Sequence, residues 1–289
     1  MDKPPKITPS VPAPPQRGKG ARGEGAVHPD RLGSRKRRRP PDMDRQVFPE
    51  VAPPMNVLVI DIGGTNVKIL ASGQSEPRKF PSGPKMTPQQ MVSGVKELAA
   101  DWKYDVISIG YPGRIHRGKV FLEPKNLAPG WIGFDFEAAF DCPVKLLNDA
   151  AMQALGSYQG GTLLFVGLGT GLGSALVVGG TVIPMELGHL SYRRRTYEDH
   201  VGNRGLKRLG KRKWAKHVGY AVERLIEVIH PDDVVLGGGN AKKLRDLPPG
   251  CRPGSNANAF RGGFRLWNGS DTAVSLKTPD PQVETKGAS

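Results

Sequence analysis

The segment VLVIDIGGTNVKIL, residues 57–70, contains the pattern that decides the fold. Its first four residues are apolar and predict a buried strand, and its last four predict a strand that returns beside the first. Between them, Gly63 and Gly64 suit a tight turn with positive φ. The segment therefore predicts a β-hairpin that carries Asp61 at the end of its first strand. An ordinary glycine hairpin has the same pattern, so this segment alone does not establish a binding site.

The predicted turn nevertheless carries groups that suit phosphate and metal chemistry. Backbone N–H groups in a glycine turn can cradle a phosphate, and Thr65 and Asn66 add side-chain donors. Asp61 could hold a hydrated magnesium ion, because magnesium prefers oxygen ligands and retains several of its waters.

Length and composition set the broad class. The chain has 289 residues, of which 37% are hydrophobic and 24% charged, which allows one large or two medium domains. No apolar run reaches the roughly 18 residues of a transmembrane helix, and the start lacks a signal-peptide pattern, so we expect a cytoplasmic protein. Cys142 and Cys251 are the only cysteines, which excludes a disulfide framework and a multi-cysteine zinc site.

The net charge of +15 is concentrated in two segments. Residues 1–54 contain 12 Lys and Arg and 6 acids, a net charge of +6. Arg193–His217 contains ten basic residues and two acids, a net charge of +8. A cationic face predicts an anionic partner, which could be nucleic acid, a membrane, a nucleotide or a polyanion such as polyphosphate.

The two ends of the chain are predicted to be disordered. Residues 1–54 hold 12 of the 27 prolines and few large apolar residues, so they form a basic, proline-rich arm. Its run RKRRR could bind nucleic acid, although a solvated tail is the favoured interpretation. Met43 and Met55 are further possible starts, so the arm need not be part of the native protein. Residues 268–289 form a disordered tail.

Between the ends, the pattern predicts strands and helices in two successive units. A sheet with helices packed on it accounts for this order. The first unit is predicted to contain a helix from Pro88 to Trp102 with Thr87 as N-cap, strands at Val106–Gly110 and Val144–Leu147, a hairpin at Arg114–Leu122, and helices at Phe136–Phe140 and Ala150–Tyr158. The second is predicted to contain strands at Thr162–Leu168, Ser174–Val178 and Val234–Leu236, a helix from Asn240, and a last helix at Asn256–Trp267 weakened by Gly262 and Gly263.

The second unit repeats the glycine hairpin of the first. Its turn reads GLGTGLG, residues 167–173, and a third strand runs into Gly237, Gly238 and Gly239. No G-x-G-x-x-G register fits and a strand follows the turn, which excludes a Rossmann site, and the P-loop pattern is absent too. Three such junctions together predict a site for a nucleotide or a phosphate chain.

Basic residues recur at helical spacing after the second turn. Arg204, Arg208, Arg212 and Lys216 follow one another every four residues, without interleaved acids. They share one face only if Gly205 and Gly210 do not interrupt the helix. Because their mutual repulsion is costly, the stripe is a candidate surface for a polyanion.

Asp149 is the best candidate for a general base. It lies at the end of a predicted strand and just before a predicted helix, where the helix dipole favours the ionised carboxylate. An ordinary N-cap aspartate would occupy the same position, and only the wider pattern favours catalysis.

These segments resemble a known family. DIGGT at 61–65, LNDA at 147–150, GLGTGLGSAL at 167–176, ELGH at 186–189 and LGGG at 236–239 resemble the motifs of the ROK sugar kinases, in the superfamily of actin, hexokinase and Hsc70. The resemblance runs from about residue 56 to 245. NLAPGWIG (126–133), GTVIPMELGHL (180–190) and RKWAKHV (212–218) are most similar to the polyphosphate-dependent glucokinase branch.

The resemblance implies an α/β chain with the two-domain actin-like ATPase (ribonuclease H-like) fold. We expect a small N-terminal kinase domain at 55–160 and a large C-terminal one at 161–267. Asp149 would take the proton from the 6-hydroxyl of the sugar. The other implied sugar-binding residues are Asn126, Asn148, Glu186 and His189. The implied phosphate- or nucleotide-binding residues are Asp61, Gly63, Gly64, Thr65, Asn66, Lys68, Gly169, Thr170, Gly171, Gly237, Gly238 and Gly239.

The resemblance also implies cofactors and partners. Mg²⁺ would be organised by Asp61 through water, and the partners would be glucose and a donor that is polyphosphate, ATP or both. Many ROK proteins carry a cysteine-rich zinc loop, but residues 191–200 contain no cysteine, so we expect no zinc. We further expect a homodimer that binds neither membrane nor nucleic acid. The alternative is a sugar-responsive regulator or a hexose-binding protein without kinase activity, although residues 1–54 show no helix-turn-helix.

Overall fold

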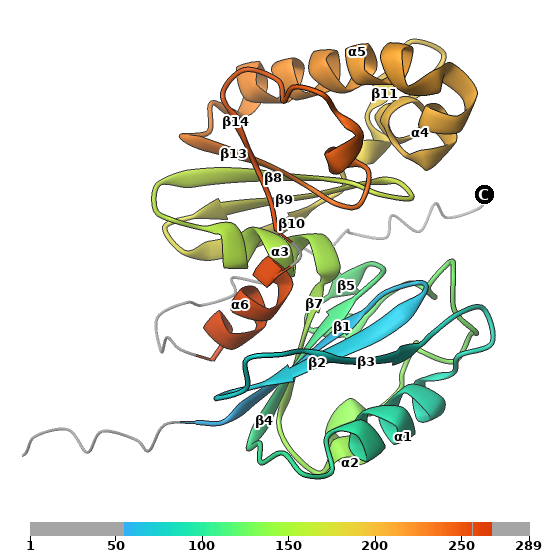
Figure 1. Ribbon diagram of the computed structural model, residues 1–289, viewed down its shortest axis with the longest axis vertical. Helices are drawn as coiled ribbons and strands as arrows, with labels where there is room; N and C mark the ends of the chain where they lie inside the picture. The colour runs from blue at the N-terminus through green and yellow to red at the C-terminus, as the bar shows by residue number, and fades with distance from the viewer. Residues whose placement is uncertain (1–54, 256, 268–289) are drawn as a thin grey trace, which may run out of the picture. The chain divides into compact units, whose positions relative to one another are not determined.

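The computed structural model describes residues 55–255 and 257–267. The predicted arm, 1–54, and the predicted tail, 268–289, lie outside the described residues. The described chain forms two five-stranded sheets, which carry helices on their faces (Figure 1). Among the described helices, none combines the length and apolar character needed to cross a membrane.

The first sheet has the strand order β3-β2-β1-β4-β7. Its central strand β1 pairs antiparallel with β2 and parallel with β4, and β4 pairs parallel with β7. The predicted hairpin is confirmed, with Asp61 opposite Lys68 in the β1–β2 register. The strands are β1 (Val57–Ile62), β2 (Asn66–Ala71), β3 (Arg78–Pro81), β4 (Val106–Tyr111) and β7 (Val144–Asn148).

The second sheet repeats the plan of the first. Its order is β10-β9-β8-β13-β14, with the same sequence of antiparallel and parallel pairings. The two glycine turns, between β1 and β2 and between β8 and β9, therefore hold matching positions, as the sequence predicts. The strands are β8 (Thr162–Leu168), β9 (Leu172–Val178), β10 (Thr181–Met185), β13 (Asp233–Gly237) and β14 (Cys251–Pro253).

The remaining elements are helices and short connections. Thr87 caps α1 through a capping box with Gln90, as its position predicts. The α-helices are α1 (Pro88–Leu98), α2 (Phe136–Phe140), α3 (Asp149–Ser157), α4 (Tyr197–Val201), α5 (Asn203–Ile229) and α6 (Ala257–Arg265). The short elements are β5 (Ile115–His116), β6 (Lys119–Val120), β11 (Ser191–Tyr192), β12 (Arg195–Thr196) and the 3₁₀ turns η1 (Leu187–His189) and η2 (Ala241–Lys243).

Strand alternation assigns side chains to the two faces of each sheet. In Figure 1, α1 and α2 lie on one face of the first sheet and α3 and α6 on the other. In β1, Leu58 and Ile60 pack with residues of α1 and α2, whereas Val57 and Val59 pack with residues of α3 and α6. Asp61 has the parity of Val57 and Val59, so its side chain projects toward the face of α3 and α6. In β8 the alternation separates the residues that pack with α3 from those that pack with α5.

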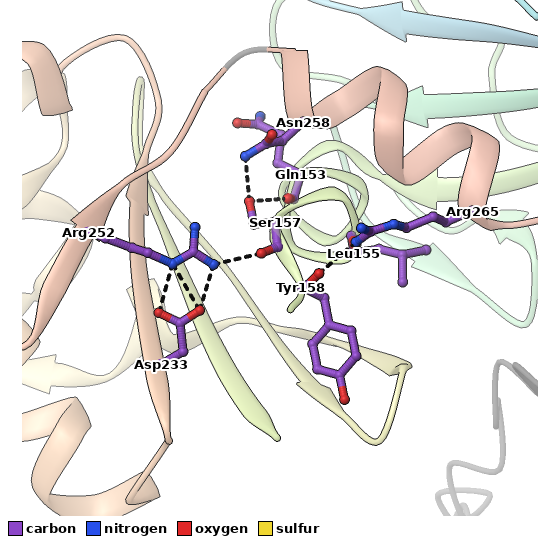
Figure 2. Close-up of polar contacts among 8 residues, drawn as sticks. All are labelled: Gln153, Leu155, Ser157, Tyr158, Asp233, Arg252, Asn258 and Arg265. Carbon is purple, nitrogen blue, oxygen red and sulfur yellow. Dashed lines mark hydrogen bonds and ion pairs between the residues drawn. The ribbon is translucent and has the colours of Figure 1, made fainter. Parts of the chain in front are cut away.

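Helices α3 and α6 cross in close contact. A Cβ on Gly156 would overlap the carbonyl of Asn258, and one on Gly262 would overlap the carbonyl of Met152. The side chain of Asn258 also donates to Ser157 Oγ at 2.8 Å (Figure 2). Such an approach of two backbones requires glycine on both helices.

Two arginines hold the C-terminal end of α3 (Figure 2). Arg265 Nη1 donates to the carbonyls of Leu155 (2.6 Å) and Tyr158 (2.8 Å). Arg252 Nη2 donates to the carbonyl of Ser157 at 2.6 Å and forms an ion pair with Asp233. Cations at this end satisfy free carbonyls and complement the helix dipole.

Several sequence predictions require correction. Gly63 and Gly64 do not have positive φ; Gly63 is required because a Cβ there would lie 2.9 Å from Asn66 O. The helix predicted from Asn240 is only the 3₁₀ turn η2. The basic stripe is not on one continuous helix, because α5 is interrupted at Gly210, where φ is 72° and ψ is 160°.

Candidate active site

Asp149 is the first residue of α3, but it does not cap the helix. Asn148 is the N-cap, and its Oδ1 accepts hydrogen bonds from the amides of Ala150 (3.0 Å) and Ala151 (3.3 Å). Asn148 Nδ2 donates to the carbonyl of Gly113 at 3.0 Å. The ordinary N-cap interpretation of Asp149 is therefore wrong, and capping is the work of Asn148.

The carboxyl of Asp149 has a perturbed proton affinity. Burial, reinforced by the charges of Asp61 and Glu186, raises the pKa of Asp149 to about 6. The amide of Ala150, which donates to Asp149 Oδ1 at 2.7 Å, opposes the shift. A carboxyl with a pKa near neutrality is poised to exchange a proton with a bound group.

Asp61 is the charged group that contributes most to the raised pKa of Asp149. Burial raises the pKa of Asp61 itself, and the ammonium of Lys68, 3.6 Å from Asp61 Oδ2, only partly opposes the shift. Lys68 is thus placed as the ion-pair partner of Asp61. The carboxylate of Asp61 suits a hydrated magnesium ion, which would take its remaining oxygens from phosphate and water. The described residues contain no group of three or more His, Cys, Asp or Glu side chains that could hold a metal by themselves.

The first glycine turn is closed by short contacts. Gly63 N donates to Asn66 O at 3.0 Å, and Ser82 Oγ donates to Gly63 O at 2.5 Å. Asn126 lies against this turn, because a Cβ on Gly64 would be 3.3 Å from Asn126 Cβ. Gly64 and Thr65 are exposed at the tip. The structure therefore brings Asn126, predicted to bind sugar, beside the turn predicted to bind phosphate.

The second and third glycine segments lie together. Asn240 Nδ2 donates to Gly169 O at 2.9 Å, and a Cβ on Gly238 would meet Leu168 O at 2.5 Å. The amide of Asn203, at the start of α5, donates to the carbonyls of Gly169 (3.0 Å) and Thr170 (3.1 Å). The β8–β9 turn is thereby held from two sides.

The start of α3 lies beside the same hairpin. A Cβ on Gly173 would be 2.9 Å from the Cβ of Ala150, the residue that follows Asp149. Asp149 is thus adjacent to the second hairpin, and the charge of Asp61, on the first hairpin, raises its pKa. Helix α6 contacts both α3 and β1, the elements that carry these two carboxylates.

Glu186 and His189 occupy the two ends of η1. His189 Nδ1 lies 4.0 Å from Glu186 Oε2, and both side chains are more than half exposed. Their exposure leaves both side chains free to contact a ligand, and Glu186 also acts electrostatically on Asp149.

Glu198 is a site residue that the sequence pattern missed. A Cβ on Gly171 would overlap its carboxylate, and a Cβ on Gly188 would lie 3.5 Å from Glu198 Cβ. Glu198 therefore stands between the second glycine turn and η1. The available signal was its acidity within a segment of ten basic residues and two acids.

The predicted cationic stripe is divided. Arg204 forms ion pairs with Glu198 at 3.6 Å and Asp199 at 3.2 Å, so two acids that precede the stripe, on α4, offset part of its charge. Arg208 donates to the carbonyl of Asp199 at 3.0 Å. Arg212 and Lys216 are exposed and lie beyond the interruption at Gly210, so they do not extend a straight row from Arg204 and Arg208.

Comparison with known proteins places this arrangement in a family. A model of the ROK family matches residues 57–205, just over half of the chain. The polyphosphate glucokinase of Mycobacterium tuberculosis is 27% identical over 212 residues, which cover 66% of this chain and 80% of that protein. The bifunctional enzyme NanE/NanK of Brucella melitensis is 25% identical over 238 residues, and the match spans 65% of this chain but only 46% of that enzyme.

A solved structure supports the architecture. The inorganic polyphosphate/ATP-glucomannokinase from Arthrobacter sp. strain KM superposes with a TM-score of 0.62 and 24% sequence identity, covering 73% of this chain and 97% of that one. At this identity the likeness shows the fold, which is the actin-like ATPase fold, with its two sheets of equal strand order. The family match, the repeated sheets and the shared motifs lead to one conclusion: this chain belongs to the ROK family of sugar kinases.

Proposed function

We propose that this protein transfers a phosphoryl group from polyphosphate, ATP or both to the 6-hydroxyl of glucose. The observation that carries the proposal is Asp149, a carboxylate that lies beside a glycine hairpin, is not the N-cap of α3 and has a pKa of about 6. Its surroundings are those of a general base rather than of a structural aspartate.

The chemistry follows from the positions of the residues. The carboxylate of Asp149 accepts the proton of the sugar hydroxyl, the hydroxyl oxygen bonds to the terminal phosphorus of the donor, and the bond from that phosphorus to the leaving phosphate breaks. Asp61 would hold magnesium, which supplies charge neutralisation of the phosphates. Asn126, Asn148, Glu186 and His189 would orient the sugar, and Glu198 adds a carboxylate between η1 and the second glycine turn.

The donor would lie across the glycine turns. Gly63, Gly64, Thr65 and Asn66 offer the first, and Gly169–Gly171 with Gly237–Gly239 the second. Phosphoryl transfer requires mainly in-line positioning and neutralised charge, so no further covalent residue is needed. The basic segment 193–217 favours polyphosphate as a donor, because a linear polyanion gains from many cations.

A coupled assay tests the proposal. Purified protein is given glucose, mannose or N-acetylmannosamine with ATP or long-chain polyphosphate, and sugar 6-phosphate formation is followed. We expect turnover with glucose and a loss of about 10²- to 10⁴-fold in Asp149→Ala, the usual contribution of a positioned base. A near-normal rate in Asp149→Ala with an unchanged circular dichroism spectrum would reject Asp149 as the base. Turnover of another hexose in preference to glucose would reject the glucose assignment alone.

A further inference from the structure

A pocket of about 440 Å³ lies outside the glycine turns and the residues implied to bind sugar, and its lining includes Arg208 of the predicted basic stripe. It is formed where the β11–β12 hairpin meets α4 and α5. Its lining contains four guanidinium groups and two imidazoles but no carboxylate; the residues are Arg193, Arg194, Arg195, Arg208, His200 and His217, with one leucine.

The inner wall of the pocket is ordered by hydrogen bonds. Tyr192 Oη lies 3.0 Å from His217 Nδ1, and His200 Nδ1 lies 3.0 Å from the carbonyl of Thr196. Tyr192 and His200 are both buried, and the rings of His200 and His217 are 5.1 Å apart. These contacts fix the positions of the two imidazole rings in the pocket wall.

The pocket has a strongly positive field. Burial lowers the pKa of His217, and His200, Arg193 and Arg208 lower it further. The carboxylate of Asp199 is already engaged, because it accepts a hydrogen bond from Thr196 Oγ1 at 2.9 Å, pairs with Arg204 at 3.2 Å and also interacts electrostatically with Arg195. Clustered like charges are destabilising unless an anion neutralises them.

Helix α4 separates this pocket from the glycine turns. Glu198 faces Gly171, whereas His200 is packed on Tyr192 and His217. Residues two apart on an α-helix point about 200° from each other, so the two side chains leave opposite sides of α4. The first segment of α5 links the two regions: Asn203 touches the second glycine turn, and Arg208 lies about 7.5 Å further along the helix axis.

We propose that the pocket lined by Arg193, Arg194, Arg195 and Arg208 is a second phosphate-binding site, distinct from the glycine turns. Guanidinium groups suit it, because each can donate two parallel hydrogen bonds to a phosphate. The phosphate has two possible sources, the distal part of a polyphosphate donor or a separate phosphate anion. The polyphosphate source rests on the proposed function. In that case the pocket binds the distal part of the polyphosphate, while its terminal phosphate reacts at the glycine turns.

Direct binding tests the site without reference to catalysis. Calorimetry measures the affinity of tripolyphosphate for the full chain, for Arg194→Gln and for Lys103→Gln. Lys103 is exposed and lies outside both the pocket lining and the basic segment 193–217, so its variant matches the change in charge. We expect about a tenfold weaker affinity in Arg194→Gln, the loss typical of one charge-assisted hydrogen bond, and little change in Lys103→Gln. Equal affinities in the two variants would overturn the site.

Kinetics then distinguishes the two sources. If the occupant is the donor chain, Arg194→Gln raises the KM for long-chain polyphosphate about tenfold and leaves the KM for ATP unchanged. If binding is weakened but neither KM changes, the donor-anchor source is refuted and the occupant is a separate phosphate anion. A chain that shows no kinase activity refutes the proposed function, and the calorimetric comparison still decides whether the pocket binds phosphate.

Discussion

Replacement of the Asp149 carboxylate by an amide should increase stability while it removes activity. The folded protein raises the pKa of Asp149 from 3.8 to about 6. Between these values the folded chain binds more protons than the unfolded chain, so the free energy of unfolding falls as pH rises through that window. Above about pH 6 the full cost of the partly buried, ionised carboxylate is present, and Asp149→Asn removes it.

The magnitude follows from the shift. About two pKa units at roughly 1.36 kcal/mol each give up to about 3 kcal/mol at neutral pH. For a domain of this size, 1 kcal/mol moves Tm by about 2–4 °C, so Tm should rise by up to about 10 °C. Activity should fall by about 10²- to 10⁴-fold, because the amide cannot accept the proton.

Thermal unfolding, followed by circular dichroism at about pH 7.5 and about pH 4, measures the effect in the two protonation states. The gain should be large at the higher pH and mostly lost at the lower one, where Asp149 in the original chain is largely protonated. Asp246→Asn, at an exposed position, is the matched control and should show no comparable gain. An Asp149→Asn protein that is no more stable than the original at neutral pH would refute the reasoning, as would a gain that is equal at both pH values.

Three further predictions follow from the same contacts. The kcat/KM for the sugar should fall about tenfold per pH unit below about pH 6, and Glu186→Gln should move this limb to lower pH, as a pH profile of each protein would show. Gly262→Ala should cost about 1–3 kcal/mol in urea unfolding because its methyl overlaps Met152 O. Gly219→Ala, a helical glycine with open space around it, should instead stabilise by up to about 1 kcal/mol; equal effects would contradict the crossing argument. Arg252→Met should cost about 1–3 kcal/mol, because Asp233 and the carbonyl of Ser157 lose their shared donor, and a neutral result would show that water replaces it.

Much of the fold could be predicted from local patterns. The β1–β2 and β8–β9 hairpins, the capping box at Thr87 and the helix Phe136–Phe140 follow from apolar runs, glycine turns and caps, all of which are short-range signals. The predicted repetition of one plan is confirmed by two sheets of equal order. The strands β3 and β14 were not predicted, because RKFP and CRP are too short and polar to show alternation.

The candidate site was predicted less completely, for a physical reason. Asp61 and Asp149 could be selected because each follows an apolar strand, whereas Glu198 lies on the five-residue helix α4, inside a basic segment. Its position beside Gly171 and Gly188 depends on tertiary packing that no local pattern encodes. The prediction of one continuous cationic face is wrong for a related reason. Sequence periodicity does not reveal that Gly210 leaves the helical region of φ and ψ.

The glycines of α6 show how local propensity and tertiary packing can oppose each other. Gly262 and Gly263 lower the helix propensity of the segment, so the sequence alone predicts a weakened helix there. In the structure, Gly262 admits the backbone of α3, and a Cβ on Gly263 would overlap Val59 of β1. The carbonyl of Gly263 also accepts a 2.7 Å hydrogen bond from Ser108 of β4. Asp61 is the penultimate residue of β1 and Asp149 is the first residue of α3, so α6 packs against both elements that carry the two carboxylates. The glycines that lower the helix propensity of α6 are therefore the residues that allow this packing.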